Sequence, residues 1–138
     1  MSEVVTLGET MAVICPDQPH PLAEATRLTL DIAGAESNLA ILLSRFGPRV
    51  SFISRVGNDA FGQRIRATLA VENLDLSHLM IDEDAPTGIF FREWLPDGKR
   101  RVLYYRADSA ASRLSPEDLQ PEMFQGARIL HVTGITPA

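Results

Sequence analysis

The sequence predicts an α/β fold in which a parallel sheet is covered by helices and an antiparallel hairpin is inserted. Two observations lead to this prediction. In the first half of the chain, apolar runs typical of buried strands alternate with helical segments, and a strand–helix–strand order indicates a parallel sheet. Near residue 96, two strand-like runs are joined by a short turn, which is the pattern of an antiparallel hairpin.

Three strands are expected in the N-terminal segment. Val4 to Leu7 is a short apolar run closed by a glycine, as in a buried strand. Met11 to Ile14 forms a second run, and the turn residues 17–21 separate it from the third. Residues Arg27 to Ile32 alternate polar and apolar side chains, which is typical of a strand with one exposed face.

Two helices flank a strand at Val50 to Val56. The first is expected to end at Gly47 and Pro48 and to place on the core four apolar residues at helical spacing, Leu39, Leu42, Leu43 and Phe46. In the second, Asp59 is expected to cap the N-terminus, and the inward side chains are those of Phe61, Ile65 and Leu69.

The hairpin is expected to pair residues Thr87 to Leu95 with Arg100 to Arg106 through a Pro-Asp-Gly-Lys turn. Beyond it, Ser115 and Pro116 indicate a helix start, Gly126 ends a second short helical piece, and residues 129–133 form another buried strand. A strand of a parallel sheet should be followed by a crossover helix, and none follows this one. The pattern therefore predicts a chain truncated within an α/β domain.

Composition restricts the classes of partner. The chain has 138 residues, which fits one domain, and a formal net charge of −5, which argues against nucleic-acid and membrane-surface partners. Its single cysteine, Cys15, excludes an internal disulfide and any CxxC motif, as suits a reducing cytoplasm. We see neither a signal peptide nor an apolar run long enough to span a membrane. We therefore predict a soluble, cytoplasmic protein.

A glycine-rich turn at residues 57–62 follows a strand and opens a helix, so a dinucleotide site has to be considered. That motif requires a glycine where this chain has Asp59, whose charge would repel a phosphate. We favour a tight turn with an acidic helix cap. The sequence also lacks a Walker motif, a metal-binding cluster around its three histidines and any catalytic base that we can defend.

Two segments are candidate ligand contacts. The first is a small-residue turn that lets a ligand approach the backbone and offers hydrogen bonds, and its candidates are Gly34, Ala35, Glu36, Ser37 and Asn38. An ordinary capped strand-to-helix turn is the alternative.

The second candidate segment is the hairpin. On one face of it Phe90, Arg92 and Trp94 are expected to lie beside Val102, Tyr104 and Arg106. Aromatic rings can cover the C–H faces of a polyhydroxy carboxylate, and an arginine can bind its carboxylate with two hydrogen bonds. The alternative is an amphipathic sheet with a surface ion pair.

Taken together, these motifs resemble the first half of the PfkB or ribokinase-like carbohydrate kinases. The matching segments are 4–9, 33–40 with the later Gly47, and 56–62. Within that family, the chain is most similar to 2-keto-3-deoxygluconate kinases in three places, Tyr104-Tyr105-Arg106, Ser109 to Ser112 and residues 131–135. Met11 and Val13 stand where ribose and adenosine kinases carry an aspartate, which argues against a ribose-type substrate.

The resemblance implies a ribokinase-like parallel sheet with helices on both faces and a β-sheet lid formed by strands at about 11–14, 25–32 and 87–106. It also implies sugar contacts from the turn at 34–38, from Phe90 and from the strand with Tyr104, Tyr105 and Arg106, where Arg106 would hold the substrate carboxylate. ATP, Mg²⁺ and the catalytic base would be bound or supplied by a second half that this sequence does not contain, and the 138 residues alone would be inactive. Many relatives form homodimers through their lids, and we expect the same here.

Two alternatives stay open. A fructokinase or another hexose kinase carries similar residues at the positions of Tyr105-Arg106 and Ser109-Ala110. A sugar-binding or interaction module without catalysis is the alternative from a different class of protein.

Overall fold

A four-stranded parallel sheet forms the body of the protein. The computed structural model describes residues 1–136, and its body sheet has the order β5-β4-β1-β8. These strands are β1 (Val4–Leu7), β4 (Val50–Gly57), β5 (Leu79–Asp82) and β8 (Ile129–His131). Each neighbouring pair is parallel, with Val4 opposite Val50 and Ile129. The predicted α/β class is therefore confirmed.

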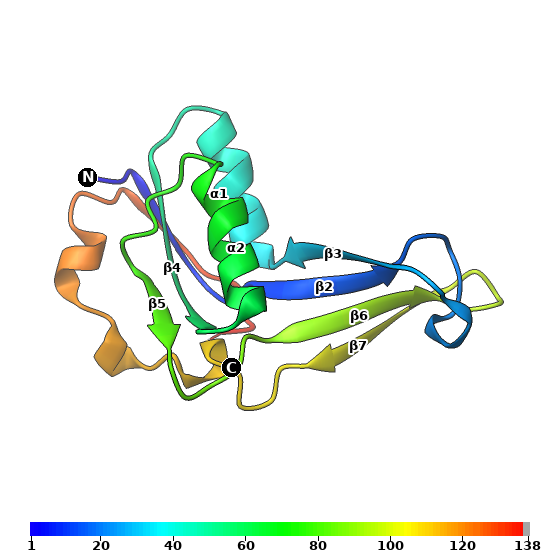
Figure 1. Cartoon of the computed structure of the whole chain (residues 1–138). Helices are drawn as coiled ribbons and strands as arrows, with labels where there is room; N and C mark the ends of the chain where they lie inside the picture. Colours follow the sequence, from blue (N-terminus) through cyan, green and yellow to red (C-terminus); the bar gives the residue numbers. More distant parts are fainter. Residues whose placement is uncertain (137–138) are drawn as a thin grey trace.

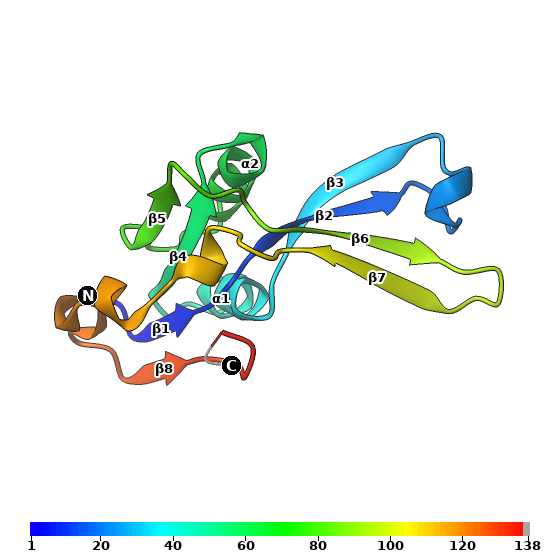
Figure 2. The same cartoon turned by 90° about the horizontal axis from the view of Figure 1, so that it is seen from below.

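Both α-helices lie on one face of this sheet, as Figures 1 and 2 show. Helix α1 (Ala35–Arg45) packs Ala40 on Val4 and Val50, and α2 (Ala60–Ala70) packs Ile65 and Leu69 on Phe52 and Val56, as predicted. Phe61, also predicted to face inward, is half-buried and lies outside this cluster. The opposite face is covered by three short 3-10 helices, η2 (Ala111–Arg113), η3 (Pro116–Asp118) and η4 (Pro121–Phe124). Within the described residues, none of the helices is long and apolar enough to cross a membrane.

A second four-stranded sheet projects from the body (Figure 1). We call it the projecting sheet; its order is β3-β2-β6-β7, from β2 (Met11–Pro16), β3 (Leu28–Ala33), β6 (Ile89–Trp94) and β7 (Arg100–Tyr105). The predicted hairpin is confirmed, because β6 and β7 are antiparallel with Phe90 opposite Tyr104. Gly98 in its turn has φ +79°, a conformation that favours glycine. The short helix η1 (Leu22–Glu24) connects β2 and β3.

The orientation of α1 differs from the predicted one. Its buried residues are Glu36, Ser37 and Ala40, whereas Leu42 and Phe46 are 51% and 78% exposed. Tertiary contacts bury the start of the helix, where Ser37 donates a hydrogen bond to Thr10 at 3.0 Å and Glu36 accepts from Thr133. Leu43 of the predicted stripe does pack on Val4 and Val50, so the buried face is shifted from the predicted one and not reversed.

The C-terminal segment also departs from the predictions. Ser115 and Asp118 form a capping box, but the helix that they begin has three residues, because Gln120 precedes a proline and such residues disfavour the α conformation. Strand β8 was predicted to be buried and is instead an edge strand in the described part of the chain, with Ile129 57% exposed. Strand β5 was missed, although the apolar residues 79–81 follow a turn built by Asp75 and Ser77.

Candidate functional site

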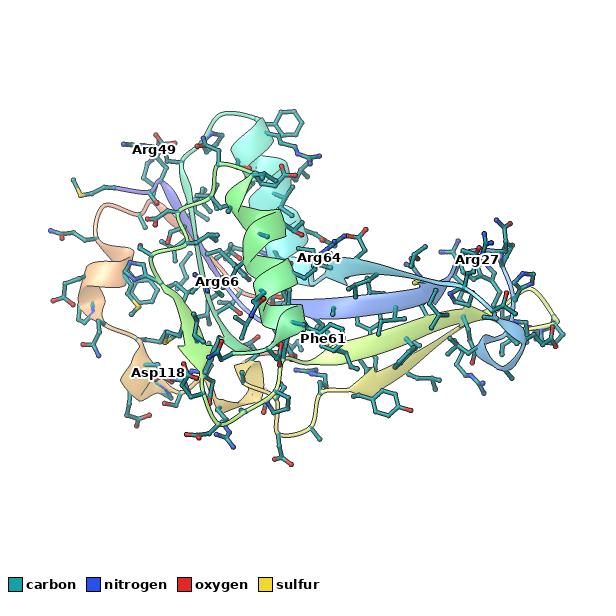
Figure 3. All side chains as sticks on the ribbon, viewed as in Figure 1. Arg27, Arg49, Phe61, Arg64, Arg66 and Asp118 are labelled. Carbon is teal, nitrogen blue, oxygen red and sulfur yellow. The ribbon has the colours of Figure 1, made fainter. Side chains whose placement is uncertain are left out.

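The C-terminal ends of the parallel strands meet at one edge of the body sheet, where α/β proteins commonly bind ligands. Glu9 follows β1, Asp59 follows β4 and Thr133 follows β8. The projecting sheet leaves the body at the same edge (Figure 1). A cavity of about 650 Å³ opens there, and the residues that line it include Phe61, Thr87, Ile89, Tyr104, Tyr105 and Arg106. In Figure 3, Phe61 lies at the start of α2 beside the base of β6.

A buried carboxylate lies next to this cavity. Glu9 is 6% exposed, and its Oε2 lies 2.6 Å from Nη2 of Arg106, which follows β7. The contact with Arg106 is an ionic one outside hydrogen-bond geometry, while Ser109 donates a hydrogen bond to Oε1 at 3.0 Å. Burial raises the pKa of the Glu9 carboxyl above its ordinary value, although Arg106 and Ser109 act in the opposite direction.

The aromatic residues divide between the two faces of the projecting sheet. Phe90 is buried against Met11, Val13 and Cys15, and its ring centroid lies 5.5 Å from that of Tyr104, which is 61% exposed. Tyr105 lies on the opposite face, edge-on to Phe91 at 5.6 Å. Tyr104 and Tyr105 both line the cavity, because β7 is an edge strand and its two faces are accessible there.

The turn at residues 34–38 packs against the segment that contains Glu9. Gly34 is the N-cap of α1, and a Cβ at this position would overlap the carbonyl oxygen of Glu9. The side chains of Glu36 and Ser37 are buried with protein partners, Glu36 accepting hydrogen bonds from Thr133 and Ser37 donating to Thr10.

These contacts give two of the five candidates of the turn a packing role. The other two non-glycine candidates, Ala35 and Asn38, are exposed. Gly34 therefore holds the turn close to Glu9, and Ala35 and Asn38 are the members of the turn that solvent or a ligand can reach.

Asp59 joins α2 to the base of the projecting sheet. Its carboxylate accepts hydrogen bonds at 2.8 Å from the amides of Gly62 and Thr87 and from the Thr87 hydroxyl. That hydroxyl accepts in turn from the Gly57 amide at 2.9 Å. Burial opposes ionisation, but the hydrogen bonds from Thr87 and Gly62 outweigh it and hold the pKa of Asp59 below its ordinary value. The predicted acidic helix cap is confirmed, and its negative charge occupies the place that a phosphate would need.

The structure therefore gathers four of the predicted site residues, Gly34, Phe90, Tyr104 and Arg106, around Glu9 and Met11. Sequence reasoning did not single out Glu9, Ser109 or Thr87 as members of a site. For Glu9 a signal was present, because an acidic residue directly follows a buried strand at the edge where ligands bind. Ser109 and Thr87 carry no comparable signal, since each bonds a residue at least 28 positions away.

The solved structures that resemble this fold are sugar kinases and related proteins. A PfkB protein from Polaromonas sp. JS666 is 38% identical with a TM-score of 0.92, covering 98% of this chain and 46% of that one. A 2-dehydro-3-deoxygluconokinase from Thermotoga maritima is 28% identical with a TM-score of 0.91, covering 99% of this chain and 42% of that one.

Curated relatives agree with the structural matches. A 2-dehydro-3-deoxygluconokinase of Thermoproteus tenax is 39% identical over all of this chain and 43% of its own length. A second, from Bacillus subtilis, is 40% identical over 99% of this chain and 42% of its own length. The chain thus spans less than half the length of these relatives. The family model described as pfkB family carbohydrate kinase matches residues 1–138. The chain belongs to the pfkB family of carbohydrate kinases.

Proposed function

We propose that this chain supplies the sugar-binding part of an ATP-dependent kinase whose substrate is 2-keto-3-deoxygluconate. Two relatives at 39% and 40% identity are named for that substrate under its synonym 2-dehydro-3-deoxygluconate. The observation that carries the proposal is the position of Arg106. It lines the cavity beside the exposed Tyr104, and Glu9 occupies only one of its terminal nitrogens. The second hydrogen of that nitrogen and an N–H of its neighbour can still bind a carboxylate with two hydrogen bonds.

The surrounding residues suit the remainder of a sugar acid. The exposed ring of Tyr104 offers an apolar face and a hydroxyl, and the exposed Asn38 offers an amide donor and acceptor. The ring of the buried Phe90 packs against the ring of Tyr104. Phosphoryl transfer depends mainly on positioning and charge stabilisation. In this proposal the chain contributes the positioning of the sugar.

We infer that ATP and Mg²⁺ are bound by residues outside this chain. Phosphates commonly bind at helix N-termini, and both α-helices of the described chain carry a carboxylate there. Glu36 is buried in the first turn of α1, and Asp59 caps α2. Neither terminus fits a phosphate group. A sugar kinase from Pyrococcus horikoshii that is 28% identical has been solved with ATP, and this chain covers 41% of it.

A fructokinase is the second candidate. One observation favours it: the charge of Glu9 partly neutralises Arg106, which suits a substrate without a carboxylate. A probable fructokinase of Arabidopsis thaliana is 31% identical over 96% of this chain and 39% of its own length.

We also propose a cytoplasmic homodimer that associates through the projecting sheet. The aromatic residues Phe90, Phe91 and Trp94 of the hairpin do not form an exposed patch, since Phe90 is buried and the other two are half-buried. The large apolar residues exposed on one face of this sheet are Leu28, Leu30 and Tyr105, while Val102 and Tyr104 are exposed on the opposite face, and we propose the face with Leu28 and Leu30 as the interface. Such patches commonly meet a partner.

The test of the function compares two sugars. The protein expressed from its complete reading frame is assayed for sugar-dependent ADP release with 2-keto-3-deoxygluconate and with fructose. A clearly higher kcat/KM for the sugar acid supports the proposal, and a higher value for fructose supports the second candidate. Binding of a sugar without any ADP release would indicate the non-catalytic module.

A further inference from the structure

The ion pair between Glu9 and Arg106 connects two distant parts of the chain at the candidate site. Glu9 lies in the short connection between β1 of the body and β2 of the projecting sheet, and Arg106 follows β7, the last strand of that sheet. Glu9 is 6% exposed, whereas the side chain of Arg106 is 35% exposed. The carboxylate is therefore the fixed member of the pair, and the guanidinium reaches from it toward the cavity.

The surroundings of Glu9 hold its side chain in one position. Ser109 donates to Oε1 at 3.0 Å, and a Cβ on Gly88 would lie 2.5 Å from the same oxygen. Gly88 also brings the chain close to Arg106, whose Cβ would lie 3.4 Å from such an added atom. A glycine at position 88 thus lets the base of β6 approach both members of the pair.

We propose that Glu9 is a positioning residue that orients Arg106 toward the carboxylate of the sugar acid and thereby sets the preference for acidic over neutral sugars. This inference rests on the proposed function. An arginine binds a carboxylate with two hydrogen bonds only when its guanidinium is held within reach of the ligand, and an ion pair at one nitrogen limits where the group can lie. Glu9 contacts Nη2 alone, and because Nη2 carries two hydrogens, a ligand carboxylate can still bind Nη2 together with Nη1 or Nε.

Glu9→Gln tests the proposal because it removes the charge and nearly preserves the size of the side chain. A group displaced by about 1 Å can reduce an enzyme's rate roughly a hundredfold. We expect Glu9→Gln to weaken binding of 2-keto-3-deoxygluconate by about ten- to a hundredfold and to change binding of fructose about threefold or less. The measurement is calorimetric titration of each sugar into the protein expressed from its complete reading frame.

Glu93→Gln is the matched control. Glu93 is 2% exposed and pairs with Arg101 at 2.5 Å in the same sheet, away from the residues that line the cavity. It should lower stability without changing the ratio of the two sugar affinities. Ser109→Ala, which removes one hydrogen bond to Glu9, is a milder second variant. It should reduce sugar-acid affinity less than Glu9→Gln, again with little effect on fructose.

A pH titration of the wild type needs no variant. The charged groups that face Glu9 are Arg106 and, from α1, Glu36, and burial of Glu9 raises its pKa above 4.5. As the pH falls through that pKa, Glu9 is neutralised and releases Arg106, so sugar-acid affinity should decrease. This pH dependence should be absent in Glu9→Gln.

Two results would overturn the proposal. Sugar-acid affinity that rises in Glu9→Gln or at low pH would show that Glu9 opposes the ligand, and equal losses for both sugars would show a structural role. A different result tests the proposed function itself, which fails if Arg106→Ala leaves sugar-acid binding unchanged.

Discussion

Replacing Arg106 with alanine should discriminate between an acidic and a neutral substrate. If Arg106 binds the carboxylate of 2-keto-3-deoxygluconate, the substitution leaves that charge without its partner. Losing one member of a desolvated charge pair costs about 2–5 kcal/mol. The Arg106 side chain is 35% exposed, so solvent screens the interaction and the lower half of that range applies. At roughly 2–3 kcal/mol, kcat/KM for the sugar acid should fall about 30- to 150-fold.

The same substitution has a second effect that does not depend on the sugar. It leaves the carboxylate of Glu9, which is 6% exposed, without its positive partner. An unpaired buried polar group costs on the order of 1–3 kcal/mol of stability, and this loss lowers activity on every substrate alike. The ratio of the two kcat/KM values separates the effects, because the shared loss cancels in it.

The assay measures kcat/KM for 2-keto-3-deoxygluconate and for fructose in the wild type, Arg106→Ala and Arg106→Lys. Lysine should restore part of the preference, because a single ammonium group cannot reproduce two parallel hydrogen bonds. An equal decrease for both sugars would refute the reasoning. It would show that Arg106 acts through Glu9 on the fold, and it would favour the fructokinase candidate.

Two further predictions concern stability and assembly. Asp59→Asn should lower the free energy of unfolding at neutral pH by about 1–3 kcal/mol in urea denaturation, because Gly62 and Thr87 lose a charged acceptor. In the wild type the stabilisation by ionised Asp59 is present above pH 3.8 and disappears as the pH falls through the lower pKa of folded Asp59. A difference in stability between the two proteins that persists well below that pKa would contradict the prediction. Leu28→Glu should weaken a homodimer formed through the projecting sheet, as measured by sedimentation, and a wild type that stays monomeric at high micromolar concentration would exclude that dimer.

Local signals in the sequence predicted much of the fold. The Pro-Asp-Gly-Lys turn defines the β6–β7 hairpin with four adjacent residues, and Asp59 caps a helix that begins at the next residue. The rotation of α1 could not be predicted in this way. It depends on contacts with distant residues, such as the hydrogen bond from Ser37 to Thr10, 27 positions away, and Leu42 matches the apolar spacing but is exposed.

The candidate site was predicted only in part, because the sequence reveals local pairs of residues and not distant ones. Phe90 and Tyr104 face each other because the hairpin turn sets their register, which local sequence reveals. Glu9 and Arg106 meet where the projecting sheet leaves the body. Ser109, which donates a hydrogen bond to Glu9, is 100 positions away from it in the sequence. A lone acidic residue and a lone arginine at such a separation carry no pattern from which their pairing could be deduced.

Two of the polar links between the projecting sheet and the body should respond differently to a sugar acid. Asp59 accepts hydrogen bonds from the neutral amide and hydroxyl of Thr87, and we do not expect a ligand carboxylate to displace Asp59 from them. Glu9 holds Arg106 through an ion pair at Nη2, and a ligand carboxylate would bind the same guanidinium beside it.

Sugar-acid binding should therefore alter the end of β7 and leave the base of β6 in place. In hydrogen exchange, we expect 2-keto-3-deoxygluconate to change the protection of the amides of residues 104–109 more than that of Thr87, because only the former depend on Arg106. Fructose serves as the control, since it brings no carboxylate to Arg106. Equal changes at both links with the sugar acid, or the same pattern with fructose, would contradict the distinction between them.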